Sequence, residues 1–208
     1  MQTATQIQLS EVEIQRLEAG ELVKIAANWE EFMDFLEETP YKAEFANNEI
    51  TITGLAIFLH EWLVGQMCWI LKNFYLGQAN VLVLGSNLGV SRPESSYFNP
   101  DVTVIKDVPE FYRKSKAIIK NPYLVVEILS ESTAKYDSEI KLPRYQKMTS
   151  VQVIVLIDPK EKEITVVNRT ADPKVWLMSI YDQPTDAVVI DGNTLPLASF
   201  FEGMPVFA

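Results

Sequence analysis

The chain has 208 residues, a formal net charge of −10, 48% hydrophobic residues and 22% charged residues. This composition supports a sizeable hydrophobic core and excludes wholesale disorder. The negative charge argues against a broad basic surface for non-specific nucleic-acid binding, although it leaves room for a locally basic cleft. Because Cys68 is the single cysteine, a disulfide framework or a multi-cysteine zinc site within one chain is excluded.

The first part of the chain predicts a lead-in and then a helix. Residues 1–27 are polar and mixed, and they predict an N-terminal lead-in, in which "LEAGELVKI" at residues 17–25 ends as a short strand, to a single domain over residues 28–208. The first ten residues lack the basic and apolar regions of a signal peptide, so the cytoplasm is the expected location. Asn28 followed by Glu31 is a capping-box pattern, which predicts a helix that stops before Pro40.

The next segments predict a hairpin and a long helix. Residues 41–54 predict two short strands around a turn at Asn47 and Asn48. The most apolar stretch follows, and it is nearly long enough to cross a bilayer. Polar residues such as His60 interrupt it, which favours a core helix over residues 55–76 that closes at Gly77.

The rest of the chain is mostly strand. Residues 80–90 predict a strand, a turn and a strand. Further strands are predicted within residues 99–105, 123–130, 151–159, 161–169, 174–180, 187–190 and 194–201, the last three finishing the sheet. One helix is predicted over residues 132–148, where Pro143 should kink it or shift its frame. This order of elements predicts an α+β fold of α/β-like character, with a mixed sheet packed by helices and extra hairpins.

Two carboxylates stand in or beside these apolar strands. Glu127 lies within the run "PYLVVEILSEST" at residues 122–133, and Asp101 opens the run "NPDVTVI" at residues 99–105. A buried carboxylate must be paired, protonated or bound to a cation. Two carboxylates at the ends of adjacent strands form an oxygen-rich site for a hard cation such as Mg²⁺, to which the carbonyl of Ile128 could add a ligand.

The helix that follows supplies a cation. Asp137, Lys141 and Tyr145 recur every four residues, so at helical spacing they share one face. A lysine beside a metal-bound water can orient that water or stabilise the charge of a phosphate under attack. Two carboxylates, a metal ion and a lysine are the parts needed for phosphodiester hydrolysis. For Tyr145, packing is the alternative role.

These segments, together with "VIVLIDP" at residues 153–159, resemble the Uma2 family (DUF820) of the restriction-endonuclease-like PD-(D/E)XK superfamily. The resemblance covers roughly residues 29–200. It implies a restriction-endonuclease-like mixed sheet flanked by helices, cleavage of DNA that depends on Mg²⁺ or Mn²⁺, and a homodimer. The "PD" half of the superfamily motif falls on Pro100 and Asp101, and its acidic half falls on Glu127.

The resemblance also implies roles for single residues. The superfamily places a lysine two residues after the acidic position, where this chain has Leu129, and the resemblance implies that Lys141 has taken over this role. Asp101, Glu127 and Lys141 are then the catalytic candidates. Glu44 in the first hairpin joins Asp101 and Glu127 as a metal-ligand candidate. The hairpin sequence "EFANNE" and Pro143 inside the lysine helix depart from the family pattern.

Each candidate has a structural alternative. Asp101 could be a turn or strand-entry residue, and Glu127 could belong to a structural ion pair. Asp137 and Lys141 could form an ordinary i,i+4 pair on a helix surface. His60, the single histidine, matches a family position at the start of the long helix, yet it could be a satisfied core group. His60, Asp137 and Tyr145 are therefore candidates for accessory roles.

One segment is basic on an otherwise acidic chain. It is either a solvated loop or the best candidate for contacting DNA phosphates. Its basic residues are Arg113, Lys114, Lys116 and Lys120.

The sequence supports one leading function and two alternatives. The leading hypothesis is a metal-dependent endonuclease that hydrolyses DNA phosphodiester bonds. Leu129, Pro143 and the acidic net charge favour the first alternative, a catalytically silent nuclease-fold protein that acts in binding or as a scaffold. The second alternative is a phosphohydrolase of small nucleotides. The segment "GSNLGV" lacks the lysine and hydroxyl residue of a phosphate-binding P-loop.

Overall fold

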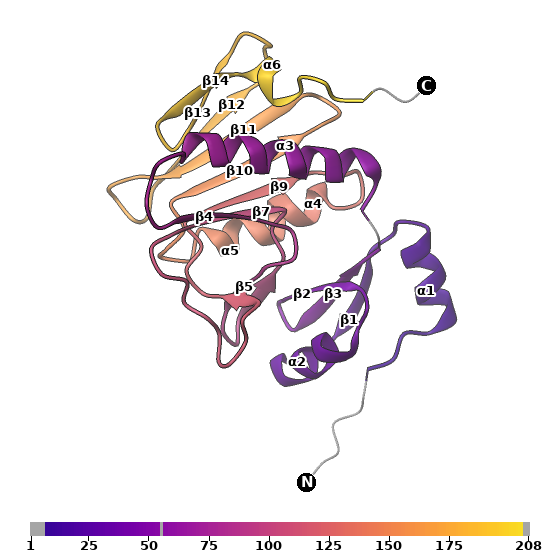
Figure 1. The fold of residues 1–208 in the computed structure, drawn as a ribbon. Coiled ribbons are helices and arrows are strands. Elements are labelled where there is room, and N and C mark those ends of the chain that lie inside the picture. The colour runs from indigo at the N-terminus through magenta and orange to yellow at the C-terminus, as the bar shows by residue number, and fades with distance from the viewer. Residues whose placement is uncertain (1–6, 55, 206–208) are drawn as a thin grey trace.

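Two mixed six-stranded sheets form the scaffold in a computed structural model that describes residues 7–54 and 56–205 (Figure 1). The first, sheet A, has the order β1-β3-β2-β6-β5-β8, with β1 at Val23–Ala26, β3 at Glu49–Thr53, β2 at Lys42–Ala46, β6 at Ser96–Phe98, β5 at Gly89–Arg92 and β8 at Ile118–Ile119. The second, sheet B, has the order β12-β11-β10-β9-β7-β4, with β12 at Trp176–Tyr181, β11 at Glu163–Arg169, β10 at Val153–Asp158, β9 at Leu124–Ile128, β7 at Val102–Lys106 and β4 at Val81–Gly85. The mixed α+β fold predicted from the sequence is confirmed.

Helices and one small hairpin complete the described part of the chain. The hairpin pairs β13 (Ala187–Ile190) with β14 (Asn193–Pro196). The helices are α1 (Glu11–Glu18), α2 (Trp29–Glu38), α3 (Phe58–Phe74), α4 (Ala134–Tyr136), the π-helical turn η1 (Asp137–Lys141), α5 (Leu142–Tyr145) and α6 (Leu197–Phe200). No helix in this described part is long and apolar enough to cross a membrane.

Local signals set the elements that precede the site. The Asn28 side chain accepts hydrogen bonds from the backbone N–H groups of Glu30 and Glu31, and the Glu31 carboxylate accepts the N–H of Asn28, so the capping box that starts α2 is complete. Between β2 and β3, Asn47 and Asn48 both have φ of 57°. Positive φ at both central residues is typical of a type I′ turn, which matches the twist of a hairpin. Both predictions are confirmed.

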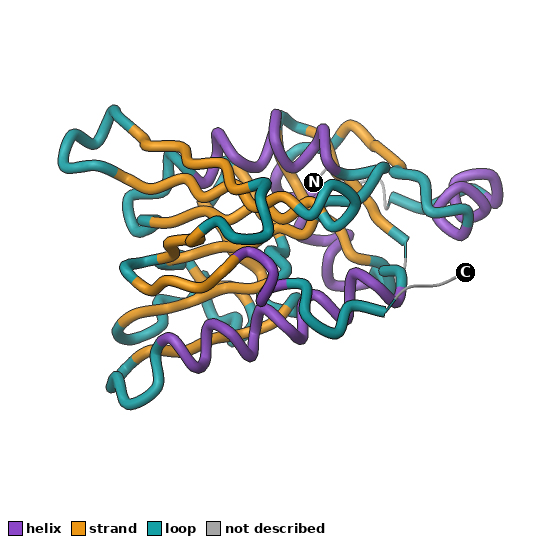
Figure 2. Tube along the Cα trace, turned by 90° about the horizontal axis from the view of Figure 1, so that it is seen from above, coloured by secondary structure: helices purple, strands orange, loops and turns teal. Residues whose placement is uncertain are grey.

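The long helix α3 covers one face of sheet B. Its buried side chains, including Leu63, Met67 and Leu71, pack into a core with the inner residues of β7, β9 and β10. The helix begins at Phe58 rather than at the predicted residue 55, which lies outside the described residues. Figure 1 shows α3 lying across the strands of sheet B, with α4 and α5 behind them. Figure 2 shows the same layers from above.

The end of the chain differs from the prediction. β13 and β14 form a separate two-stranded sheet instead of finishing the main one, and the predicted last strand becomes α6 after residue 196. Pro196 has no N–H to donate to a strand neighbour and stands at the start of this helix. Val188, Leu197 and Phe200 are buried in the core that contains α3 and sheet B. Burial of these side chains against α3 and sheet B therefore favours a helix over the predicted strand at residues 197–200.

The region predicted as a lead-in contains ordered structure. Ser10 and Glu13 form a capping box at the start of α1. β1 pairs with β3 in antiparallel orientation, from Val23 opposite Ile52 to Ala26 opposite Glu49. Residues 1–6 lie outside the described part of the chain. The N-terminal segment therefore contributes an edge strand to sheet A.

The chain passes between the two sheets twice in a short stretch. β4 belongs to sheet B and the following β5 to sheet A, and β6 belongs to sheet A and the following β7 to sheet B. The second crossing is the segment Asn99, Pro100 and Asp101. Asp101 donates its backbone N–H to the carbonyl of Val126 at 3.0 Å, which ties the crossing to β9. The candidate site lies at this seam.

Candidate active site at the seam of the two sheets

Asp101 and Glu127 lie on neighbouring strands, as the sequence predicts. β7 pairs with β9 so that Val102 stands opposite Val126, which places Asp101 just before β7 beside Glu127 on β9. Asp101 accepts the backbone N–H of Ile128 at 2.8 Å through its Oδ2 atom. Both carboxylates are buried, with 3% and 1% of their residue surfaces exposed. Their burial requires compensating partners.

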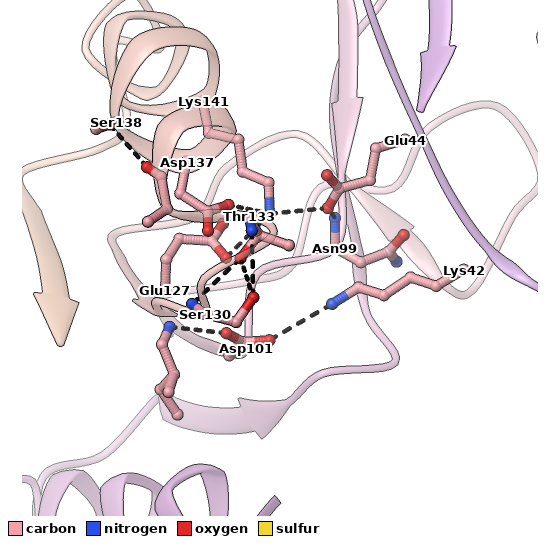
Figure 3. Close-up of polar contacts among 12 residues, drawn as sticks. Lys42, Glu44, Asn99, Asp101, Glu127, Ser130, Thr133, Asp137, Ser138 and Lys141 are labelled. Carbon is pink, nitrogen blue, oxygen red and sulfur yellow. Dashed lines mark hydrogen bonds and ion pairs between the residues drawn. The ribbon is translucent and has the colours of Figure 1, made fainter. Parts of the chain in front are cut away.

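Glu44 reaches the same place from sheet A. It lies in β2 and is 1% exposed, and its Oε1 atom accepts the backbone N–H of Asn99 at 2.9 Å. Because Asn99 belongs to the crossing between the sheets, this bond connects sheet A to the segment that carries Asp101. Figure 3 shows Glu44 pointing toward Lys141 across the seam. The structure thus brings together the three metal-ligand candidates from distant parts of the sequence.

A π-helical turn carries Asp137 and Lys141 into the site. The backbone N–H of Leu142 bonds the carbonyl of Asp137, which is the i,i+5 bond of a π-helix. The wide turn comes directly before Pro143, whose ring removes an N–H and disfavours a regular α-helix at this point. The predicted shift of the helical frame therefore takes the form of a π-turn.

Lys141 is the centre of a buried ionic cluster. Its Nζ atom lies 3.1 Å from Oε1 of Glu44, 3.1 Å from Oε2 of Glu127 and 3.0 Å from Oδ1 of Asp137. Tyr145 donates its hydroxyl to Oε1 of Glu127 at 2.5 Å. Asp137, Lys141 and Tyr145 therefore share one face, as their spacing predicts, and that face is turned toward Glu127. Their catalytic and accessory roles stay predictions.

The charges in this cluster determine the protonation of Lys141. Burial alone would lower the pKa of Lys141, but the carboxylates of Asp137, Glu127 and Glu44 outweigh it and raise the pKa well above its ordinary value. Lys141 is therefore an ammonium ion. Burial raises the pKa of the Glu127 carboxyl well above its usual range, against the opposing charge of Lys141. The site carries more carboxylates than cations to balance them.

Asp101 has its own pair of basic partners. Its Oδ2 atom lies 3.1 Å from Nε2 of His60, near the start of α3, and its Oδ1 atom lies 3.4 Å from Nζ of Lys42 in β2. Burial alone would raise the pKa of Asp101, but the hydrogen bond with His60 and the charge of Lys42 hold it well below its usual range. Asp101 is therefore ionised.

Lys42 is a site residue that the sequence reasoning missed. It lies two residues before Glu44 on β2, so the two side chains share a face of that strand. That spacing was the available signal. The Lys42 side chain is 31% exposed, whereas that of Lys141 is 7% exposed. Lys42 is thus the cation of the site that solvent and an incoming anion can reach.

A cavity of about 500 Å³ opens at the seam. Its lining includes Lys42, Glu44, His60, Asp101, Glu127 and Lys141. None of the four basic residues of the 111–120 segment lines it. Arg113 lies 3.4 Å from Glu30 and Lys120 lies 3.6 Å from Glu110, in exposed ion pairs. Contact of this segment with DNA stays a prediction.

The donor set at the seam suits a hard divalent cation. Four carboxyl groups, those of Glu44, Asp101, Glu127 and Asp137, meet two lysine side chains, so carboxyl groups outnumber the lysines. Within the described residues no group of three His, Cys, Asp or Glu side chains is arranged to hold a metal ion. Mg²⁺ commonly binds one or two carboxylates and keeps several waters, so the pair Asp101 and Glu127 fits it.

Comparisons with known proteins identify the family and the fold of this chain. The family model Uma2, described as "Putative restriction endonuclease", matches residues 29–198. Two uncharacterized proteins from Synechocystis are similar: one is 30% identical over 72% of this chain and 84% of its own length, and the other is 28% identical over 81% and 87%. A crystal structure of a "putative nuclease belonging to DUF820" from Anabaena variabilis shares the fold, with a TM-score of 0.66, 18% identity, and coverage of 82% of this chain and 97% of the other.

Proposed function

This chain belongs to the Uma2 family, described as "Putative restriction endonuclease", and from that premise we propose that it is a metal-dependent endonuclease hydrolysing DNA phosphodiester bonds. The observation that carries the proposal is the Lys141 ammonium, held 3.1 Å from Glu127 in the cavity that Asp101 also lines. This closeness speaks against the catalytically silent alternative, for which a lysine far from the carboxylates would be expected.

In the proposal, Asp101 and Glu127 hold Mg²⁺ or Mn²⁺, and Glu44 adds a carboxylate to their surroundings. The bound ion would polarise the scissile phosphate and lower the pKa of a coordinated water. Lys141, as an ammonium ion, can stabilise negative charge and orient a water molecule, but it cannot accept a proton. Lys42 provides the accessible positive charge for a DNA phosphate at the mouth of the cavity. DNA as partner, a homodimer as the assembled form and the cytoplasm as location belong to this proposal.

The test measures cleavage and metal binding in the same set of proteins. Purified wild type, Asp101→Asn, Glu127→Gln and Lys141→Met are incubated with supercoiled plasmid, single-stranded DNA and mononucleotides, with Mg²⁺, with Mn²⁺ or with EDTA. The matched control is Glu131→Gln, four residues from Glu127 and exposed in a pair with Lys160. Melting temperatures with and without Mn²⁺ report metal binding independently of activity, because an ion that binds the folded state stabilises it.

We expect metal-dependent nicking by wild type and by Glu131→Gln, and its loss in the three site variants. We also expect Mn²⁺ to raise the melting temperature of wild type, but not that of Asp101→Asn or Glu127→Gln. Equal cleavage by wild type and site variants would reveal a contaminating nuclease and reject the proposal. Turnover of mononucleotides without DNA cleavage would favour the phosphohydrolase alternative.

A further inference from the structure

Sheet B ends in a strand, β12, whose outer side is unpaired within the described part of the chain. β12 pairs with β11 on one side, and within the described part of the chain no second strand pairs with it. An unpaired edge presents a row of backbone N–H and C=O groups that can bind another strand. Figure 1 shows β12 on the far side of sheet B from β4 and β7.

This edge lacks the usual protection against pairing. Natural edge strands are commonly blocked by charged residues, proline or a bulge. Residues 175–181, "VWLMSIY", contain no charge and no proline. The exposed apolar side chains among them are large: Val175 is 49% exposed, Leu177 59%, Met178 50% and Ile180 58%. An apolar, uncharged edge in contact with water favours a partner strand.

The exposed apolar surface continues beyond the strand. Val189 on β13 is 40% exposed, and its backbone N–H donates to the Tyr181 hydroxyl at 3.4 Å. The patch therefore extends from β12 to the adjoining hairpin. A partner that covered the edge would bury side chains of both elements.

The charges that flank β12 match a second copy of the same strand. Lys174 precedes the uncharged run and Asp182 follows it, each four residues from Met178. When two copies pair in antiparallel orientation around Met178, Lys174 of each copy stands opposite Asp182 of the other. Both residues are exposed, and neither forms an ion pair with another described residue. Opposite charges at such positions favour this register over shifted ones.

The same register pairs side chains of complementary size. Trp176 stands opposite Ile180 of the second copy, and Val175 opposite Tyr181, so aromatic rings meet β-branched side chains at four positions. Aromatic and β-branched neighbours are among the favourable cross-strand pairs. Residues that face each other in this register are an even number of positions apart. Each face of sheet B therefore continues as the same face of the second copy.

We propose that β12 is a homodimerisation edge, at which two copies join antiparallel around Met178 to form one continuous sheet. The contact is isologous, so the same surface serves both copies. The net charge of −10 opposes association in general, but screening limits that repulsion to about 8 Å at physiological ionic strength, and the edge itself is uncharged. The homodimer is already part of the proposed function, on which this inference rests for the assembly alone; what it adds is the edge and the register, and neither depends on nuclease activity.

The test combines mass measurement with a charge exchange. Sedimentation equilibrium of the full chain gives the dissociation constant of wild type, whose dimer has twice the 23.6 kDa mass of the chain. The variants are Met178→Lys, Lys174→Asp, Asp182→Lys and the double exchange K174D/D182K. Controls with the same charge changes at exposed positions elsewhere are Lys147→Asp and Asp34→Lys. Circular dichroism confirms that each variant is folded.

We expect a dimer for wild type and both controls. Met178→Lys places two like charges on the symmetry axis and should give monomers. Each single exchange should weaken the dimer about tenfold or more, since it creates two like-charge contacts, and the double exchange should restore the wild-type constant within about threefold. A monomeric wild type, a dimer unaffected by Met178→Lys, or a double exchange as weak as the single ones would overturn the proposed edge.

Discussion

At the scale of single residues, Lys141 differs from a surface lysine because three carboxylates share its charge and its side chain is largely buried. An exposed ion pair contributes little to stability, since water and salt screen it. A buried pair costs free energy to desolvate, and breaking it leaves an uncompensated charge. The role of Lys141 in folding and its proposed role in catalysis therefore have to be measured separately.

Replacing Lys141 with methionine should destabilise the fold. Glu44, Glu127 and Asp137 would remain buried without their shared cation, so we expect the free energy of unfolding to fall by about 3–5 kcal/mol. Urea denaturation at pH 7 measures this change. The control is Lys160→Met, which removes an exposed pair with Glu131 and should leave the midpoint unchanged. A midpoint for Lys141→Met equal to wild type would show that the carboxylates do not depend on Lys141.

The sequence predicts part of the site at this scale. Asp101 and Glu127 could be recognised because a carboxylate in an apolar strand demands a partner, and strand alternation indicates where that partner lies. For Lys42 the sequence offers only its spacing from Glu44, since its contact is Asp101, 59 positions away. Such a contact depends on how sheet A meets sheet B. The basic 111–120 segment shows the opposite case. Its basic residues are close together in sequence, yet none of them lines the cavity.

At the scale of elements, Gly54 and Gly65 differ in whether an added Cβ atom would fit. Substitutions at these two positions therefore test close packing and helix propensity separately. A Cβ on Gly54, after β3, would lie 2.3 Å from the backbone oxygen of Leu17 at the end of α1. A backbone oxygen cannot turn away as a side chain can. Apart from the adjoining residues and the backbone of its own helix, a Cβ on Gly65 within α3 would meet no atom within 4 Å.

We expect Gly54→Ala to lower the free energy of unfolding by about 1–3 kcal/mol. Gly65→Ala should raise it by about 0.5–1 kcal/mol, because alanine loses less backbone entropy in a helix. Urea denaturation of the two variants and wild type measures both changes. If Gly54→Ala were as stable as wild type, the close approach of α1 to the end of β3 would be wrong.

The β13–β14 hairpin is fastened to the rest of the protein through Asp191. This carboxylate accepts hydrogen bonds from Tyr75 at 2.8 Å, Tyr123 at 2.7 Å and Lys106 at 2.7 Å. Partial burial alone would raise the pKa of Asp191, but these bonds outweigh it and lower the pKa below its ordinary value. The hairpin therefore depends on the ionised form of this residue.

A carboxylate with a lowered pKa stabilises the folded state at pH values above its unfolded pKa, which is about 3.9. That contribution is lost as the pH falls through the lower folded pKa. We expect Asp191→Asn to be less stable than wild type at pH 7, with a gap that narrows below about pH 4. Urea midpoints of both proteins from pH 7 to pH 3 test this. A gap that stays constant would contradict a role for the Asp191 charge.

Elements were predictable where their signals are local. The cap of α2 and the Asn47–Asn48 turn lie within the segments that they shape, and both appear as predicted. Residues 197–200 are mostly apolar, which is compatible with a strand or a helix. Packing against α3 favours the helix. The π-turn before Pro143 was predictable as a disturbance of the helix, but its π-helical form was not.

At the scale of the whole molecule, the sequence indicates a mixed fold but not the division of the strands. β4 and β5 are predicted as a strand, a turn and a strand, and each exists, yet they lie in different sheets. No local pattern distinguishes a turn within a sheet from a crossing between two sheets. The seam, which forms the site, is therefore a property of the complete chain.

A chain that begins at Asn28 should be less stable than the full chain. It would lack β1, and with it the buried side chains of Leu17 and Val23, which are 2% and 1% exposed. Loss of one buried leucine and one buried valine corresponds to about 3–5 kcal/mol. Urea denaturation of both chains measures the difference. Equal stability would support the simpler interpretation of residues 1–27 as a dispensable lead-in.

The register of sheet B sets the separation of the two Glu127 residues in the proposed dimer, which can be compared with the length of one turn of DNA. Glu127 lies in one row with Leu156, Thr165 and Ile180, so its position relative to the edge at β12 is fixed. Pairing at that edge would put seven strand spacings, roughly 34 Å, between the two β9 strands. Because Ile180 would stand opposite Trp176, the two Glu127 residues would also be offset by four residues, about 13 Å, along the strands. One turn of B-form DNA is about 34–36 Å long. In the proposed nuclease, a duplex lying across the dimer would therefore meet two centres separated by roughly one helical turn.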